Sequence, residues 1–163
     1  MQIGEAFVGS GPEAAHLNTV LGERDGPVGA AWATALATPR AGHVAFVTVI
    51  RPGLAVKPLT LFINKAALAG AEHSRLTWGA AQAGVAGGVL DAVAAGVIDR
   101  PAADRLVLLA AAWVDPEAAD EQLVYTNNRE ATTAALAAGH DGKPDLNELL
   151  AARDGPANPF FLV

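Results

Sequence analysis

The sequence predicts an α/β (α+β) two-layer sandwich, in which helices pack on a mixed β-sheet. Two observations carry this prediction. Short β-branched runs bounded by glycine or proline are interleaved with alanine-rich stretches of helical spacing along the chain. The length of 163 residues is that of one domain with a core of its own. Strands that alternate with helices are typical of helices packed on a mixed sheet.

The first half of the chain supplies most of the predicted strands and one helix. The helix begins at Pro27, because proline suits a first helical turn, and runs to Thr38 before Pro39 stops it. The run HVAFVTVI is β-branched and lies between Gly42 and Pro52, so we expect a single buried strand there. The predicted strands of this half cover residues 2–8, 16–21, 43–50 and 59–64.

The second half is dominated by helices. A long helix is expected over residues 78–97, where apolar residues recur at helical spacing. Its glycines at 84, 87 and 88 present a smooth face and predict close approach to another element, because glycine lowers helix propensity by roughly 1 kcal/mol relative to alanine. The remaining predictions are a strand over 106–114, a short edge strand over 122–126 and a helix over 128–138.

The chain changes character near residue 140. Residues 1–140 are predicted to form a single domain and residues 141–163 a C-terminal extension, which mixes turn residues with one short amphipathic piece at 146–152. The apolar end at 160–163 is unfavourable in water, so we expect the extension to dock on the body or on a neighbouring subunit.

Composition excludes several classes of function. The chain has no cysteine, which removes disulfides, thiolate catalysis and cysteine-ligated metals. Its net charge is −6 and its only lysines are at 57, 65 and 143, which argues against nucleic acid and anionic membranes as partners. The N-terminus has no signal-peptide pattern, so a cytoplasmic protein is expected. With 17% charged residues against 52% hydrophobic ones, buried subunit interfaces and hence a homo-oligomer are expected, although the alanine bias also inflates the hydrophobic count.

No common nucleophile, metal or nucleotide motif is present. GxSxG, HExxH, GxGxxG and Walker A patterns are all missing, so neither a bound metal nor a permanent cofactor is expected. The remaining candidates are isolated polar residues: His16, Lys65 and Gln82. Each also has a structural interpretation, as a capping histidine, a strand-end lysine and a helix-surface glutamine. The other histidines look structural, with the one at 43 packing or capping a strand and those at 73 and 140 lying in solvated loops.

A set of segments, in order along residues 3–138, resembles the formaldehyde-activating enzyme family. The segments are IGEAFVG, EAAHLNTVLG, GPVGAAWATAL, VIRPGLAVKP, NKA, WGAAQAGVA, DAVAAGVI and YTNNREAT. The resemblance implies a ribosomal-S5-domain-2-like fold, assembled as a homopentamer with sites between neighbouring subunits. It also implies condensation of formaldehyde with tetrahydromethanopterin, the co-substrate, to give the methylene derivative and water.

The resemblance assigns roles to particular residues. His16 matches the family's general acid, and a histidine with a pKa near 6.5 suits proton transfer at neutral pH. The matching pterin contacts are Val47, Lys65 and Gln82. Two further contact positions differ, because Asn18 stands where the family has aspartate and Ala67 where it has threonine. Asparagine keeps the shape but loses the charge, and alanine loses a hydroxyl.

These two departures keep alternatives open. One is a diverged paralogue that binds a pterin, or senses or carries formaldehyde, without catalysis. Another is an aldehyde-condensing enzyme that acts on a different amine.

Overall fold

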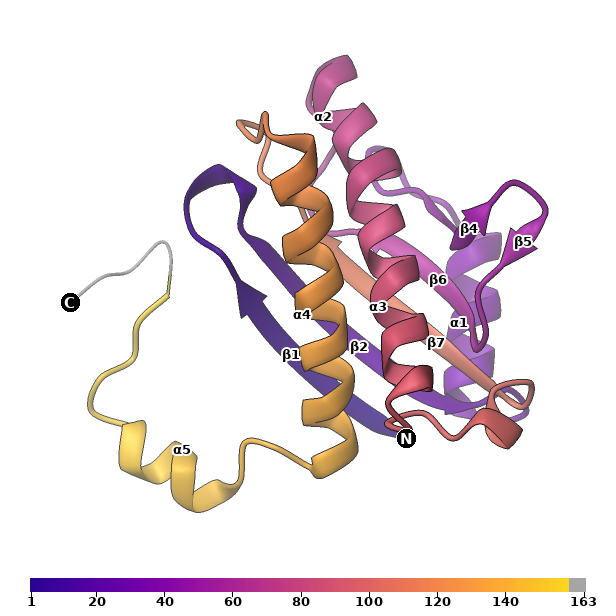
Figure 1. Ribbon diagram of the computed structural model, residues 1–163, viewed down its shortest axis with the longest axis vertical. Helices are drawn as coiled ribbons and strands as arrows, with labels where there is room; N and C mark the ends of the chain where they lie inside the picture. The colour runs from indigo at the N-terminus through magenta and orange to yellow at the C-terminus, as the bar shows by residue number, and fades with distance from the viewer. Residues whose placement is uncertain (159–163) are drawn as a thin grey trace.

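The computed structural model describes residues 1–158 and contains a five-stranded mixed sheet with helices on both faces (Figure 1). The strand order is β1-β2-β7-β6-β3; β6 and β7 are parallel and the other pairs are antiparallel. The α/β sandwich with a mixed sheet is therefore confirmed. The strands are β1 (Gln2–Val8), β2 (Ala15–Glu23), β3 (Ala45–Val47), β6 (Leu59–Asn64) and β7 (Leu106–Trp113).

Three helices define the two faces of the sheet. In Figure 1, α3 and α4 lie in front of the sheet and α1 lies behind it. The alternation of β2 agrees, since Gly22 points to the same side as His16 and a Cβ there would lie 2.6 Å from Val28 of α1. The helices are α1 (Pro27–Ala37), α2 (Gly70–Leu76), α3 (Gln82–Ala94), α4 (Glu121–Asp141) and α5 (Leu146–Ala152).

The core lies between the sheet and the α3–α4 layer. Leu17, Phe62 and Leu108 are fully buried there, together with Val85 and Val89 of α3. The predicted close approach of the glycine face is confirmed, because α3 packs against α4 through Gly84 and Gly88. Most of the apolar burial that stabilises the fold is therefore on this side, which leaves the opposite face available for a site.

Three predicted elements were wrong in extent or type. The run at 43–50 is two short strands, because Val49 leaves the main sheet and β4 (Val49–Arg51) pairs instead with β5 (Leu54–Ala55). Residues 122–126 belong to α4, whose start is capped by Asp120 accepting a hydrogen bond from the Leu123 N–H. The helix expected at 78–97 begins earlier, since α2 continues through a π-helical segment (Thr77–Ala81) into α3.

The C-terminal extension leaves the body after α4 (Figure 1). Helix α5 confirms the short amphipathic piece, and its N-cap Asp145 forms a capping box with Glu148. None of its residues is buried, and Leu146 is 69% exposed. The apolar end at 160–163 lies outside the described residues. Within the described part, no helix is long and apolar enough to cross a membrane.

Candidate active site

A cluster of polar and aromatic side chains occupies one end of the sheet. It lies on the same face as α1, in the part of that face that the helix does not cover. His16 is the second residue of β2 and pairs with Trp113, the last residue of β7. On the other side it pairs with Phe7 of β1. Lys65 follows the end of β6, and its backbone N–H donates to the Ala112 carbonyl at 2.8 Å. Because β6 and β7 are parallel, their carboxyl ends bring Lys65 and Trp113 to the same edge as His16.

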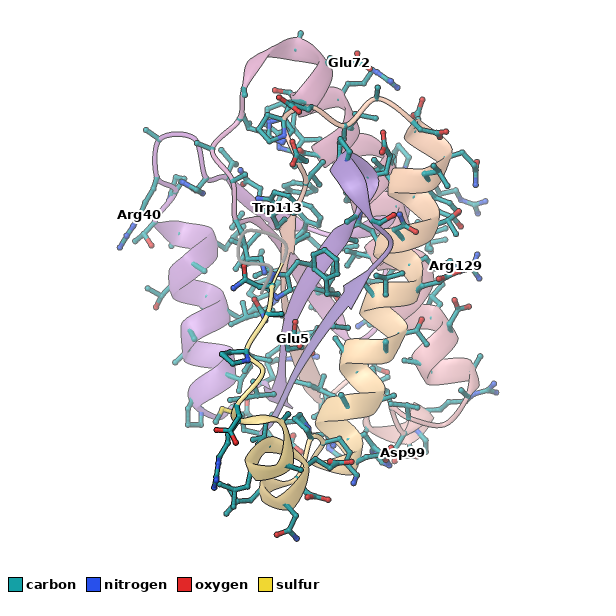
Figure 2. All side chains as sticks on the ribbon, turned by 90° about the vertical axis from the view of Figure 1, so that its left-hand side faces the viewer. Glu5, Arg40, Glu72, Asp99, Trp113 and Arg129 are labelled. Atoms are coloured by element: carbon teal, nitrogen blue, oxygen red, sulfur yellow. The ribbon has the colours of Figure 1, made fainter. Side chains whose placement is uncertain are left out.

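These side chains line a cavity of about 760 Å³. This volume lies within the range of small-molecule sites, which are mostly apolar with a few convergent polar groups. Figure 2 looks onto this face, with Glu5 and Trp113 near its centre and the C-terminal segment (yellow) passing in front. The lining residues are Glu5, Phe7, His16, Lys65, Trp113, Ala157 and Asn158.

His16 is held by its neighbours on β1. Its Nε2 lies 2.9 Å from Oε1 of Glu5, and its ring centroid lies 6.1 Å from that of Phe7. Glu5 pairs with Asn18 across the two strands, so it is a diagonal neighbour of His16 on the same face. The side chain of His16 is 37% exposed, so one side of the ring faces the cavity.

The structure brings Lys65 and Asn18 together. The Lys65 ammonium donates to Oδ1 of Asn18 at 2.7 Å. With a neutral amide in this place, the pair contains a cation but no carboxylate. Ammonium has three protons, so this bond leaves two for a ligand in the cavity.

Burial lowers the proton affinity of both basic groups. Burial is the larger cause for His16 and, with the nearby positive charge of Lys65, holds its pKa below the ordinary value of 6.5, although Glu5 opposes this. Burial likewise lowers the pKa of Lys65, and Glu5 again acts in the other direction. Glu5 therefore favours the protonated form of both neighbours.

Asn64 fixes the loop that carries Lys65 and Ala67. It is 2% exposed, and its amide nitrogen donates to the carbonyls of Gly42 and Ala66, both at 2.7 Å. Its Oδ1 accepts from the Val44 N–H at 3.1 Å. Ala67 itself is exposed beside Gly42, outside the set that lines the cavity.

The other two predicted contact residues lie elsewhere on this chain. Val47 ends β3, which is separated from β2 by β7 and β6, or about 14 Å at ordinary strand spacing. Gln82 begins α3, is only 7% exposed, and its Oε1 accepts from the Val49 N–H at 2.7 Å. The interpretation of Gln82 as a helix-surface residue was therefore wrong.

His73 is also corrected, since it is buried rather than in a solvated loop. Its Nδ1 accepts from the Ala69 N–H at 3.0 Å, and its Nε2 lies 3.0 Å from the Val114 carbonyl, so it ties α2 to the end of β7. His140 is exposed as expected but lies in the last turn of α4. His43 packs at a strand end, where its Nδ1 lies 3.0 Å from the Asn64 carbonyl oxygen.

Five lining residues were missed from the sequence: Glu5, Phe7, Trp113, Ala157 and Asn158. A weak signal was available for two of them. Glu5 and Phe7 are two apart on a predicted strand and therefore share a face, but only the register with β2 shows that this face is that of His16. Trp113 ends an apolar strand, and nothing in its local pattern separates it from a core residue.

Comparisons with known proteins identify the family of this chain. The family model described as formaldehyde-activating enzyme matches residues 3–161, and so includes the C-terminal extension beyond the segments that carry the resemblance. The 5,6,7,8-tetrahydromethanopterin hydro-lyase of Methanosarcina barkeri is 40% identical over 158 residues, covering 97% of this chain and 89% of the relative.

Longer relatives match as well. The bifunctional enzyme Fae/Hps of Methanococcoides burtonii is 40% identical over 97% of this chain, and that of Methanothrix thermoacetophila is 37% identical over 98%. This chain spans only 40% and 41% of their respective lengths. A family match over nearly the whole chain, with relatives at 40% identity, settles membership. The chain belongs to the formaldehyde-activating enzyme family.

Proposed function

We propose that this protein is a cytoplasmic hydro-lyase that condenses formaldehyde with tetrahydromethanopterin, or a closely similar reduced pterin, with His16 as the general acid. Family membership and the name of the Methanosarcina barkeri relative support the reaction. The observation that carries the assignment of the acid is the position of His16 on the wall of an apolar cavity of about 760 Å³, between Glu5 and Lys65.

The proposed chemistry needs one proton donor and two pterin nitrogens held in register. The first nitrogen attacks the formaldehyde carbon, and its N–H proton passes to the new oxygen, giving a carbinolamine. Protonated His16 then donates to this hydroxyl, the C–O bond breaks with its electron pair, and water leaves an iminium ion behind. The second nitrogen closes the methylene bridge and its N–H proton returns to His16. Positioning and one proton transfer therefore supply most of the catalysis.

The polar residues near the site suit a pterin in different ways. A backbone N–H can only donate, so the Val49 N–H must face the carbonyl oxygen of Gln82. The amide nitrogen of Gln82 is then left with two protons for a ring carbonyl of the pterin. Lys65 offers donors in the same manner, while Phe7 and Trp113 provide apolar walls. Asn18 holds Lys65 in place through its Oδ1.

The separation of Val47 and Gln82 from His16 supports a site shared between subunits. We propose a homopentamer in which one chain supplies His16 and Lys65 and its neighbour supplies Val47 and Gln82. The expected solution mass is five times 16.6 kDa, or about 83 kDa. Sedimentation equilibrium measures this mass directly, and a monomer of full activity would contradict a shared site.

Replacing the acid tests the mechanism. His16→Ala is expected to lower the enzymatic rate by roughly 10²–10⁴, the usual contribution of a general acid. The assay follows methylene-pterin formation from formaldehyde and tetrahydromethanopterin, with a no-protein control for the spontaneous reaction and tetrahydrofolate in parallel. His140→Ala removes an exposed histidine far along α4 and is the matched control. Full activity in His16→Ala would remove this residue from the mechanism.

A second candidate function is a non-catalytic paralogue that binds a pterin or carries formaldehyde. The neutral Asn18 beside Lys65 favours it, because a carboxylate there would bind a pterin N–H more strongly. The double variant Asn18→Asp with Ala67→Thr restores the family residues. If the wild-type protein is inactive and the double variant turns over, the site has lost activity by drift. If both are inactive, the ligand has changed and binding assays with other amines become the next measurement.

A further inference from the structure

We propose that Glu5 is a positioning residue that fixes which nitrogen of His16 faces the substrate and keeps the ring ready to carry a second proton. The inference rests on the proposed role of His16 as the acid. It adds a residue that neither the family resemblance nor the comparisons assign.

The two ring nitrogens of His16 have different surroundings. Nε2 lies 2.9 Å from Oε1 of Glu5, whereas Nδ1, across the imidazole ring, points away from this carboxylate. An ionised carboxylate can only accept, so the pair requires the proton on Nε2. In neutral His16 the lone pair is then on Nδ1, and a second proton must enter there. Nδ1 is therefore the atom that gives a proton to the carbinolamine hydroxyl and later receives one from the closing nitrogen.

The surroundings of His16 contain few charges. Glu5 of β1 is negative and Lys65 at the end of β6 is positive. The remaining neighbours are neutral: Phe7, Asn18, Trp113, Ala157 and Asn158. Since Lys65 bonds a neutral amide, Glu5 is the only carboxylate in the described cluster that offsets the lysine charge at His16. Its loss leaves the lysine and burial unopposed, and both act against protonation of the ring.

The structural alternative is that Glu5 is a solvated strand residue, since its side chain is 60% exposed. Its place in the strand register argues against this alternative. Glu5 lies on the same face as Phe7 and His16, contacts Nε2 directly and lines the cavity. A carboxylate behind a histidine is the arrangement by which hydrolytic triads hold one tautomer, and replacing it there disturbs the tautomer more than the geometry.

Glu5→Gln tests the proposal with two independent measurements. In ¹⁵N-detected NMR of the full-length protein, wild-type His16 is expected as the Nε2–H tautomer. The variant is expected to show a mixed tautomer population and an acid shift of the His16 titration. In kinetics, the rise of kcat toward acid pH should move to lower pH, with about a tenfold loss at pH 7.5 for a pKa lowered by about one and little change in KM. Glu23→Gln is the matched control, since Glu23 lies at the far end of β2 and its carboxylate is 3.9 Å from Arg105.

Other variants separate orientation from charge. Glu5→Asp keeps the carboxylate and should retain most of the tautomer preference. Adding Asn18→Asp to Glu5→Gln returns a negative charge near Lys65 but not at Nε2. This double variant should therefore raise the midpoint of the His16 titration without restoring the Nε2–H tautomer. An unchanged tautomer and titration in Glu5→Gln would overturn the proposal even if His16→Ala is inactive. If His16→Ala keeps full activity, the proposed function fails, and the NMR result still reports on the Glu5–His16 pair.

Discussion

Lys65 acts against the protonation of His16, although both residues line the same cavity. A histidine whose pKa lies below 6.5 is mostly neutral at pH 7, so only a minority of molecules would hold the proton that the proposed dehydration step uses. The rate above the spontaneous background should consequently rise as the pH falls toward the pKa of His16. The proposed site therefore combines the cation Lys65 with a histidine whose pKa is lowered, and this balance depends on single side chains.

Lys65→Met should raise the pKa of His16, because removing a nearby cation makes the ring easier to protonate. The acid limb of the kcat profile is then expected to move to higher pH, while KM for the pterin increases through the loss of a donor. NMR titration of His16 together with pH-dependent kinetics measures both. Lys57→Met is the control, since this lysine pairs with Asp104 on the surface. A titration midpoint that moves to lower pH would contradict the electrostatic account.

At the scale of elements, the contact between α3 and α4 supports the sheet from behind the site. A Cβ on Gly88 would lie 2.5 Å from the Arg129 carbonyl oxygen and 2.6 Å from the Thr132 Cβ. Both neighbouring atoms belong to α4. One is a backbone oxygen and the other a Cβ, so rotation of a side chain cannot move either of them away from the added methyl group. The helices can therefore lie at this distance only with glycine in the contact.

Gly88→Ala is expected to destabilise the protein by about 1–3 kcal/mol, as overpacking of a close contact does. Gly79 lies in the π-helical segment with nothing within 4 Å of its Cβ position, so Gly79→Ala should be neutral or stabilise by up to about 1 kcal/mol. Urea unfolding of both variants compares the two effects within one continuous helical stretch. Equal effects would mean that helix propensity, rather than the α3–α4 contact, governs these glycines.

At the scale of the whole molecule, the C-terminal extension returns to the face of the sheet that holds the site. Ala157 and Asn158 line the cavity opposite residues from β1, β2 and β7. The preceding α5 has no buried residue, so this part of the extension adds little to the core of a single chain. Its contribution is expected in ligand binding or in contacts with a neighbouring subunit.

Ending the chain after Gly155 removes this wall of the cavity. We expect KM for the pterin to rise about three- to tenfold, or about 1 kcal/mol of binding free energy, with little change in the unfolding midpoint. Steady-state kinetics and thermal unfolding test the two parts. A fall in the solution mass of the truncated protein would instead place the extension between subunits. An unchanged KM and an unchanged solution mass would contradict docking of the extension on the body as well as on a neighbouring subunit.

The sequence by itself determined the class of fold, the main strands and the family, because these depend on local periodicity and on motifs in order along the chain. It also identified His16 and Lys65 as the polar residues at the ends of apolar strands. The tertiary structure decided how these residues are used. Strand register brought Glu5 to His16 across β1 and β2, and the π-helical segment joined to α3 placed Gln82 against Val49. Pairing and burial depend on residues distant in sequence, so no local pattern contains them.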